Sequence, residues 1–202
     1  MPVGYRQGNI AEFPKDTAHS MSLRLKLLFL ALLVEGAAFI LALFLARYWG
    51  IALFPLTEHL LRDLLIGTAA AAMPFVLFCF TLSEKAEGIP LLGSIRKMVR
   101  GEIKAVFAST TVVDICLISL WAGLAEELLF RGVIQARWGL VAASILFGLL
   151  HFVTPAYALL ATVVGFYIGL LYHLFQSLLI PIQLHAIYDF GALIYLRYFV
   201  RE

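Results

Sequence analysis

The chain of 202 residues is 62% hydrophobic and only 14% charged, whereas a soluble domain carries about 45–50% apolar and about 25% charged residues. This composition excludes a soluble globular domain and indicates a protein that lies in a lipid bilayer. The net charge is only +2, with no basic stripe, so we expect no nucleic-acid partner.

The N-terminal part predicts a polar tail over residues 1–23, followed by a transmembrane helical domain over residues 24–202. A helix that crosses a bilayer needs about 20 predominantly apolar residues. The first two segments of that kind are 27–49, interrupted only by Glu35, and 64–82. Glu35 could contact another helix or a substrate, and the sequence identifies no partner for it.

Residues 83–107 have a different character, with apolar side chains at helical spacing and four basic residues between them. This pattern is typical of an amphipathic helix that lies in the membrane interface and does not cross it.

Four further apolar segments follow, at 110–135, 140–153, 157–175 and 178–199. The sequence therefore predicts an all-α, polytopic transmembrane helical bundle with about six spanning helices and one interfacial amphipathic helix. Gly165 and Gly169 have the spacing that permits close helix approach in lipid. Together with Gly123 and Gly132, they are also candidates for leaving room for water and a peptide.

Basic residues predict the orientation of the bundle. With six spans, eleven of the fifteen Lys and Arg residues fall on the side that holds both termini and the second loop. The positive-inside rule then places both termini in the cytoplasm. We expect an integral protein of a prokaryotic cytoplasmic membrane.

Ionisable residues inside spans cost about 2.5–3.5 kcal/mol each on insertion scales, so they are functional candidates by default. The segment at 110–135 carries Glu126, Glu127 and Arg131. Glu127 and Arg131 are four residues apart and are expected to pair on one face. Successive helical residues diverge by about 100°, so Glu126 points elsewhere and lacks a helical partner. Asp114, earlier in the segment, is expected to pair with a basic group.

Two later spans carry His151 and the pair His185 and Asp189, again four residues apart. Asp189 can fix the tautomer and orientation of the His185 imidazole. If the chain turns at 137–139, Glu126 and His151 both lie about 16–18 Å from the turn, and His185 lies about 13–14 Å deep. Three ionisable groups from separate helices therefore fall in one layer of the membrane.

The ordered set Glu126-Glu127-x-x-x-Arg131, Phe147-x-x-x-His151 and His185-x-x-x-Asp189 resembles the three signature motifs of the CPBP family. That family comprises type II CAAX prenyl endopeptidases and bacteriocin-processing proteins and is also called the Abi family. The resemblance covers a catalytic core of about residues 110–195. It implies a helical membrane bundle whose cavity holds a glutamate-dependent peptidase.

The resemblance also implies roles for the motif residues. Glu126 with His151 would activate the attacking water, His185 and residue 189 would hold the oxyanion, and Glu127 and Arg131 would support them. Residue 189 is often Asn in the family, and an ionised Asp cannot donate a hydrogen bond. Asp189 is therefore either protonated or orients His185.

Metal use stays open at this stage. The zincin pattern His-Glu-x-x-His is absent, but Glu126, His151 and His185 are candidate ligands for a two-histidine, one-carboxylate zinc site. We favour the metal-free glutamate mechanism, as the family's mechanistic picture implies, and assign no cofactor.

The expected function is thus an intramembrane endopeptidase that acts on a peptide or protein substrate, either lipidated or unmodified. Two alternatives remain. A non-enzymatic membrane protein of the bacteriocin-immunity type could use the same fold to bind a partner. A proton or ion transporter could use Glu, His and Asp at one depth as a relay, although the sequence has no inverted repeat.

Overall fold

The computed structural model describes residues 15–200 of the chain, with side chains from residue 22 onward. All regular structure in this part is helical, as predicted, and none of the described residues forms a strand. The long helices are α1 (Lys15–Trp49), α2 (Leu60–Ala70), α3 (Ala72–Leu82), α6 (Val112–Glu127), α7 (Ala136–Leu150), α8 (Pro155–Phe175) and α9 (Leu179–Tyr198). Residues 1–14 of the predicted tail lie outside the described residues, and the chain is already helical from Lys15.

Within residues 15–200, five helices are long and apolar enough to cross a bilayer, at Ser22–Trp49, Leu60–Leu82, Val112–Leu150, Pro155–Phe175 and Leu179–Tyr198. The helix at Val112–Leu150 has 39 residues and contains both the third and the fourth predicted spans, so the count differs from six. Its two arms meet at Gly139, where φ is 84°, a conformation that glycine adopts without steric cost. The chain folds back at Gly139. As a result, the rings of Phe130 and Phe147, on either side of the turn, lie only 5.0 Å apart.

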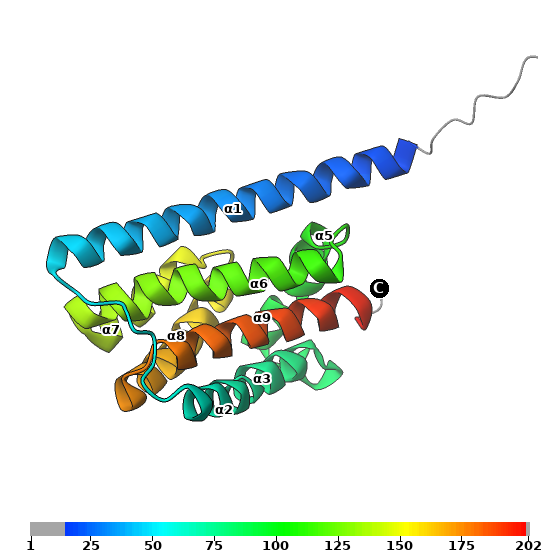
Figure 1. Cartoon of the computed structure of the whole chain (residues 1–202). Coiled ribbons are helices and arrows are strands. Elements are labelled where there is room, and N and C mark those ends of the chain that lie inside the picture. Colours follow the sequence, from blue (N-terminus) through cyan, green and yellow to red (C-terminus); the bar gives the residue numbers. More distant parts are fainter. Residues whose placement is uncertain (1–14, 201–202) are drawn as a thin grey trace, which may run out of the picture.

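Four helical elements run side by side in the bundle: α1, α6, α9 and the pair α2 and α3, which together form one span. In Figure 1, α1 lies next to α6, α6 next to α9, and α9 next to α2 and α3. The outer helix α1 presents most of its apolar side chains outward, and only 6% of its spanning window is buried. Such a helix is stable only with lipid around it, so the structure is that of an integral membrane protein.

Polar groups tie α1 to α6. Arg24 donates to both carboxylate oxygens of Asp114 at 2.6 and 2.8 Å, so the pairing expected for Asp114 is confirmed. Asp114 also accepts from the backbone N–H of Thr111, whose hydroxyl accepts from the Asp114 N–H. This capping box satisfies two free donors at the start of α6.

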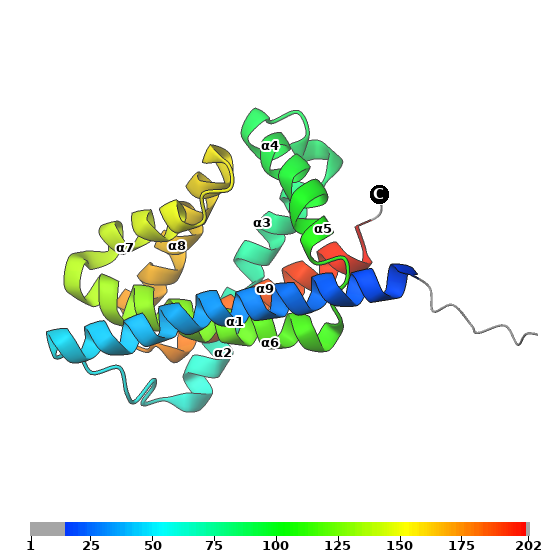
Figure 2. The same cartoon turned by 90° about the horizontal axis from the view of Figure 1, so that it is seen from above.

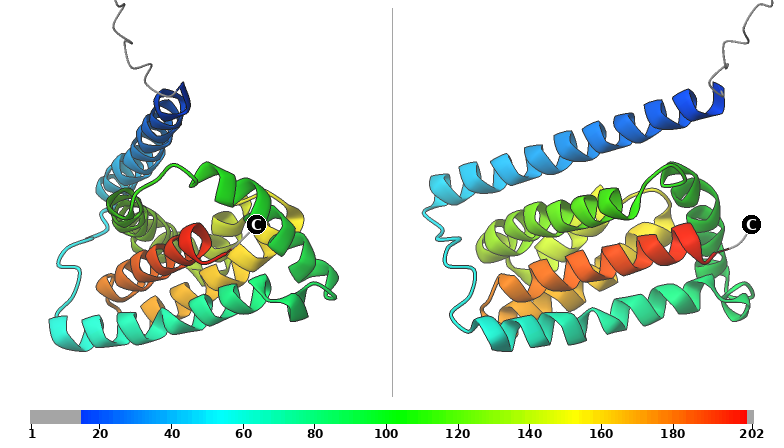
Figure 3. Two further views of the ribbon diagram at one scale, coloured as in Figure 1. Left: turned by 90° about the vertical axis from the view of Figure 1, so that its right-hand side faces the viewer. Right: turned by 45° about the vertical axis from the view of Figure 1, so that its right-hand side comes forward.

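The amphipathic segment between α3 and α6 is helical and consists of η1 (Glu84–Ala86), α4 (Pro90–Met98), the π-helical η2 (Val99–Ile103) and α5 (Lys104–Val106). Ile95, Met98 and Val99 pack inward on Leu82 and Leu196. Figure 3 shows that α4 and α5 run across one end of the bundle. Figure 2 shows that they lie on the same side of α1 and α6 as the pair α7 and α8.

The C-terminal end of α9 and the N-terminal end of α1 lie at the same end of the bundle (Figure 1). The ends of α3 and α9 and the start of α8 meet there with α4, through Leu82, Leu196 and Ala156. The N-terminal end of α1, the basic segment with α4 and the C-terminal end of α9 are therefore at one end of the bundle, as the predicted orientation requires. The orientation itself stays a prediction.

The small residues of α8 allow close packing, but they do not create a cavity. A Cβ on Gly169 would lie 2.4 Å from Leu140 Cδ1 and 2.6 Å from Gln135 Oε1. A Cβ on Gly123 would lie 2.9 Å from the α9 backbone, and one on Gly132 would lie 2.6 Å from Leu53 Cδ2. The expectation that these glycines leave room for water and a peptide is therefore wrong, because side chains and backbone of neighbouring helices fill the space beside them.

Candidate active site

Glu126 and Glu127 stand at the end of α6, and the chain continues as a π-helical segment, η3 (Leu128–Gln135). π-Helical turns are rare and often mark functional sites. The side chains of the two glutamates diverge as expected. Glu126 lines a cavity, whereas Glu127 is fully buried.

Glu127, Arg131 and His185 form what we call the buried ion cluster. Arg131 Nη1 donates to Glu127 Oε1 at 2.8 Å, and His185 Nδ1 lies 2.7 Å from the same oxygen. Arg131 Nη2 donates to the Gly165 carbonyl at 3.0 Å, and its guanidinium carbon lies 4.7 Å from the centre of the Phe147 ring. A Cβ on Gly165 would lie 3.5 Å from Arg131 Nη2, so the guanidinium packs directly against α8 at this residue.

His151 faces Glu126 across the turn of the chain. Its Nε2 lies 3.7 Å from Glu126 Oε2, which is longer than a direct hydrogen bond. Its Nδ1 lies 2.8 Å from the Phe147 carbonyl, and the His151 ring stacks on Phe147 with centroids 4.3 Å apart. The backbone contact and the stacking fix the imidazole with Nε2 toward the carboxylate.

Both ring nitrogens of His185 face carboxylates. Nδ1 contacts Glu127, and Nε2 lies 3.4 Å from Asp189 Oδ2. An imidazole donates to two carboxylates only when both nitrogens carry a proton. The arrangement therefore favours a cationic His185 whose Nε2 side is turned toward Asp189.

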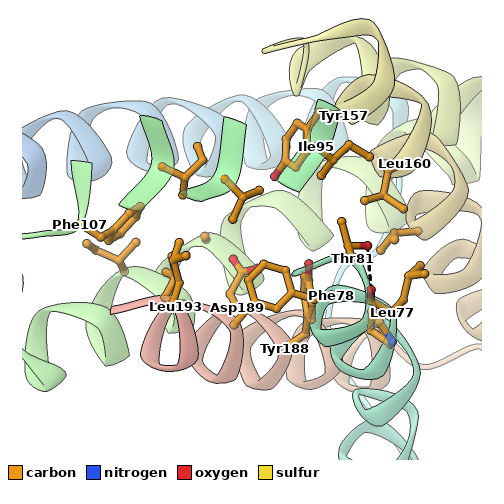
Figure 4. A pocket seen from close by; sticks show the side chains of 18 of the residues that line it. Leu77, Phe78, Thr81, Ile95, Phe107, Tyr157, Leu160, Tyr188, Asp189 and Leu193 are labelled. Carbon is orange, nitrogen blue, oxygen red and sulfur yellow. Dashed lines mark hydrogen bonds between the residues drawn. The ribbon is translucent and has the colours of Figure 1, made fainter. Parts of the chain in front are cut away.

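The site opens into two adjoining chambers. The inner chamber, of about 120 Å³, is lined by residues that include Glu126, His151, His185 and Asp189. The outer chamber, of about 260 Å³, extends from Glu126 and Asp189 to the inner face of α4, η2 and α5. The two chambers share six lining residues: Glu126, Tyr157, Leu160, Val164, Tyr188 and Asp189. Figure 4 shows the outer chamber, with Asp189 on one wall and Tyr157 on the other.

The structure therefore brings Glu126, His151, His185 and Asp189 around one space. Glu127 and Arg131 line neither chamber; they lie behind the site and hold His185.

Three residues of the chambers had no assigned role from the sequence: Tyr157, Tyr188 and Glu35. The two tyrosine hydroxyls point into the outer chamber from opposite walls (Figure 4), and within the described part of the chain neither has a hydrogen-bond partner. The position of Tyr188, directly before Asp189 and three residues after His185, was the only available signal for it.

The described residues include no three His, Cys, Asp or Glu side chains that are arranged so that they could hold one metal ion. The zinc site with Glu126, His151 and His185 stays a prediction that metal analysis of the purified protein would test.

Chemically, the arrangement provides a carboxylate and an imidazole on one side of a small space and a second, carboxylate-held imidazole on another. This set can remove a proton from water, stabilise negative charge that develops on a carbonyl oxygen and return a proton to a leaving group.

Comparison with known proteins identifies the same part of the chain. Residues 108–191 match the family model described as "Type II CAAX prenyl endopeptidase Rce1-like". All seven named residues of the three motifs lie within this range. The resemblance to the CPBP family is thereby confirmed for this segment.

Among curated proteins, the uncharacterized protein YpbD of Bacillus subtilis is 37% identical over 89 residues, which are 43% of this chain. The chain covers 47% of the length of that relative. No solved structure matches the chain.

Proposed function

Because residues 108–191 are those of a type II CAAX prenyl endopeptidase-like segment, we propose that the protein is an intramembrane endopeptidase in which Glu126 activates water. The match to this family supports a membrane peptidase, without specifying the mechanism. The observation that carries the mechanism is the meeting of the Glu126 carboxylate with His151 Nε2 at the inner chamber, opposite His185.

In the proposed reaction, water binds beside Glu126 and His151. Glu126 takes one proton from this water while the water oxygen attacks the peptide carbonyl carbon. The attack forms a tetrahedral intermediate with a negatively charged oxygen. The cationic His185 stabilises that oxyanion, and its effect is large because few water molecules screen the charge. Glu126 then returns the proton to the leaving amine, the C–N bond breaks, and an acid and an amine are released.

Asp189 acts in this mechanism through His185. As a carboxylate it cannot donate to the oxyanion, and it lies 3.4 Å from His185 Nε2. Its role is to hold the imidazole, while the hydroxyls of Tyr157 and Tyr188 are available as donors in the outer chamber.

The substrate is a peptide or protein segment that reaches the chambers within the bilayer. The outer chamber is lined mainly by apolar side chains, so an apolar or lipidated segment fits it. The Bacillus relative supports a prokaryotic cytoplasmic membrane as the location. No observation on the described residues specifically favours partner binding or ion transport.

The experiment is cleavage of a panel of apolar peptides by the purified protein in lipid nanodiscs, in water enriched in ¹⁸O. We expect new carboxyl termini that carry ¹⁸O, seen by mass spectrometry. Glu126→Ala and His151→Ala are each expected to slow cleavage by about 10²–10⁴-fold, the usual contribution of a general acid or base.

The matched control is His173→Ala, because His173 is an exposed histidine at the end of α8 that lines neither chamber. It is expected to cleave at the wild-type rate. Undiminished cleavage by both the Glu126 and the His151 variants would end the proposal.

A further inference from the structure

Glu35 is a carboxylate in the middle of a membrane span. It lies near the centre of the helix Ser22–Trp49, where an ionisable side chain is costly and is retained for a function. Its Oε2 atom is buried and has no hydrogen-bond partner among the described residues. Arg24, on the same helix, is already engaged by Asp114.

Glu35 lies where two hollows meet. It lines the outer chamber, together with Glu126 and Asp189. It also lines an apolar groove of about 520 Å³ between α1 and α6, whose wall includes Leu28, Leu32 and Trp121. Glu35 and Ile118 are the residues that both hollows share. The side chain is therefore at the junction between a lateral opening and the candidate active site.

The chambers have more acidic than basic side chains. Glu35, Glu126 and Asp189 all line the outer chamber, and no Lys or Arg among the described residues lines the chambers or the groove. Glu35 is close enough to Glu126, Asp189 and His185 for electrostatic interaction. Arg131 is buried and committed to Glu127 and Gly165. Within the described residues, the only cationic group that faces this space is thus an imidazole.

We propose that Glu35 is a specificity-determining residue that binds a basic side chain, lysine or arginine, of the substrate beside the scissile bond. This inference rests on the proposed peptidase function and deepens it. A carboxylate and an ammonium or guanidinium group form a strong charge-assisted pair where water is scarce. The substrate class is then an apolar membrane segment with one basic residue near the cleavage site, and an acidic residue at that position is repelled by three carboxylates.

The test uses three peptides that share one apolar sequence and differ only by Lys, Gln or Glu at a single position, with that position scanned along the chain. At one register we expect the wild type to cleave the Lys peptide about tenfold faster, in kcat/KM, than the Gln peptide, and the Glu peptide slowest. Glu35→Gln is expected to remove the preference for Lys, so that the ratio of kcat/KM for the Lys peptide to that for the Gln peptide falls from about ten to about one. Glu35→Lys is expected to favour the Glu peptide.

Two controls make the result decisive. Glu102→Gln removes an exposed carboxylate of η2 that lines none of these hollows, and it is expected to keep the preference. Binding of fluorescent versions of the three peptides to Glu126→Gln protein in nanodiscs reports the preference without hydrolysis.

If the wild type cleaves none of the peptides but the Glu126→Gln protein still binds the Lys peptide best, the proposed peptidase function is wrong and the role of Glu35 in binding a basic side chain is supported. Equal handling of the three peptides by the wild type, or a Lys preference that survives in folded Glu35→Gln protein, would overturn the inference.

Discussion

Two groups of ionisable residues lie next to each other in the bundle and are treated in opposite ways. In the buried ion cluster, Arg131 and His185 both contact Glu127 Oε1, at 2.8 and 2.7 Å, and none of the three residues is more than 5% exposed. In the chambers, Glu35 and Glu126 face a cavity, and the contact of Glu126 with His151 is longer, at 3.7 Å.

This difference indicates that residues adjacent in sequence have different roles. Breaking a buried charge pair by removing one partner is strongly destabilising, so Glu127 and Arg131 keep the helices in place and hold His185. A carboxylate that faces a cavity keeps its lone pairs free for water or a substrate. The chain thus uses Glu127 for structure and Glu126 for chemistry, although the two are neighbours in sequence.

The largest expected effect comes from breaking the buried ion cluster. Arg131→Met leaves Glu127 buried with only His185 beside it and should lower the free energy of unfolding by about 3–5 kcal/mol. Thermal unfolding of the purified protein in detergent measures this. The double variant Glu127→Gln with Arg131→Met removes both charges and should regain most of that loss, yet it should stay slow in peptide cleavage because His185 has lost the Glu127 carboxylate that contacts its Nδ1. Equal stability of the single and double variants would contradict the account.

A smaller loss is expected from the packing behind the cluster. Gly169→Ala places a methyl group within 2.4–2.6 Å of Leu140 and Gln135 and should cost about 1–3 kcal/mol. Gly36→Ala is the matched control, because nothing lies within 4 Å of its Cβ position, and it should be neutral or slightly stabilising. Chemical unfolding of both variants gives the comparison, and equal destabilisation by the two would refute the packing argument.

The smallest effects distinguish two tyrosines. Tyr167 donates to the Ala70 carbonyl at 3.0 Å, so Tyr167→Phe should cost about 1 kcal/mol of stability without changing the cleavage rate. Tyr157 points its hydroxyl into the outer chamber (Figure 4), so Tyr157→Phe should slow cleavage by less than about tenfold without changing stability. Melting temperature and kcat, measured on both variants, test this. The reverse pattern would assign Tyr157 to structure.

Much of this arrangement could be predicted from spacing. The apolar runs gave the spans, the interval of four gave the Glu127–Arg131 contact, and the depth argument placed Glu126 and His151 in one layer, where they lie 3.7 Å apart. All of these depend on one helix or on one turn, which helical geometry describes well.

The contacts that depend on how helices rotate against each other could not be predicted. His185 meets Glu127 across 58 residues, and the sequence suggested Asp189 as its only partner. The π-helical segment after Glu127 and the reach of Arg131 to the Gly165 carbonyl have no signature in the spacing. Tyr157 was not foreseen for the same reason, because the rotation of α8 decides which side chains face the chambers.

The most direct test of the division between Glu126 and Glu127 is to measure the cleavage rate and the melting temperature of Glu126→Gln and Glu127→Gln side by side. Glu126→Gln should lose about 10²–10⁴-fold in rate at an unchanged melting temperature, whereas Glu127→Gln should have a clearly lower melting temperature. A Glu126→Gln protein that cleaves at the wild-type rate, or one whose only defect is its stability, would contradict the assignment of Glu126 to the chemistry.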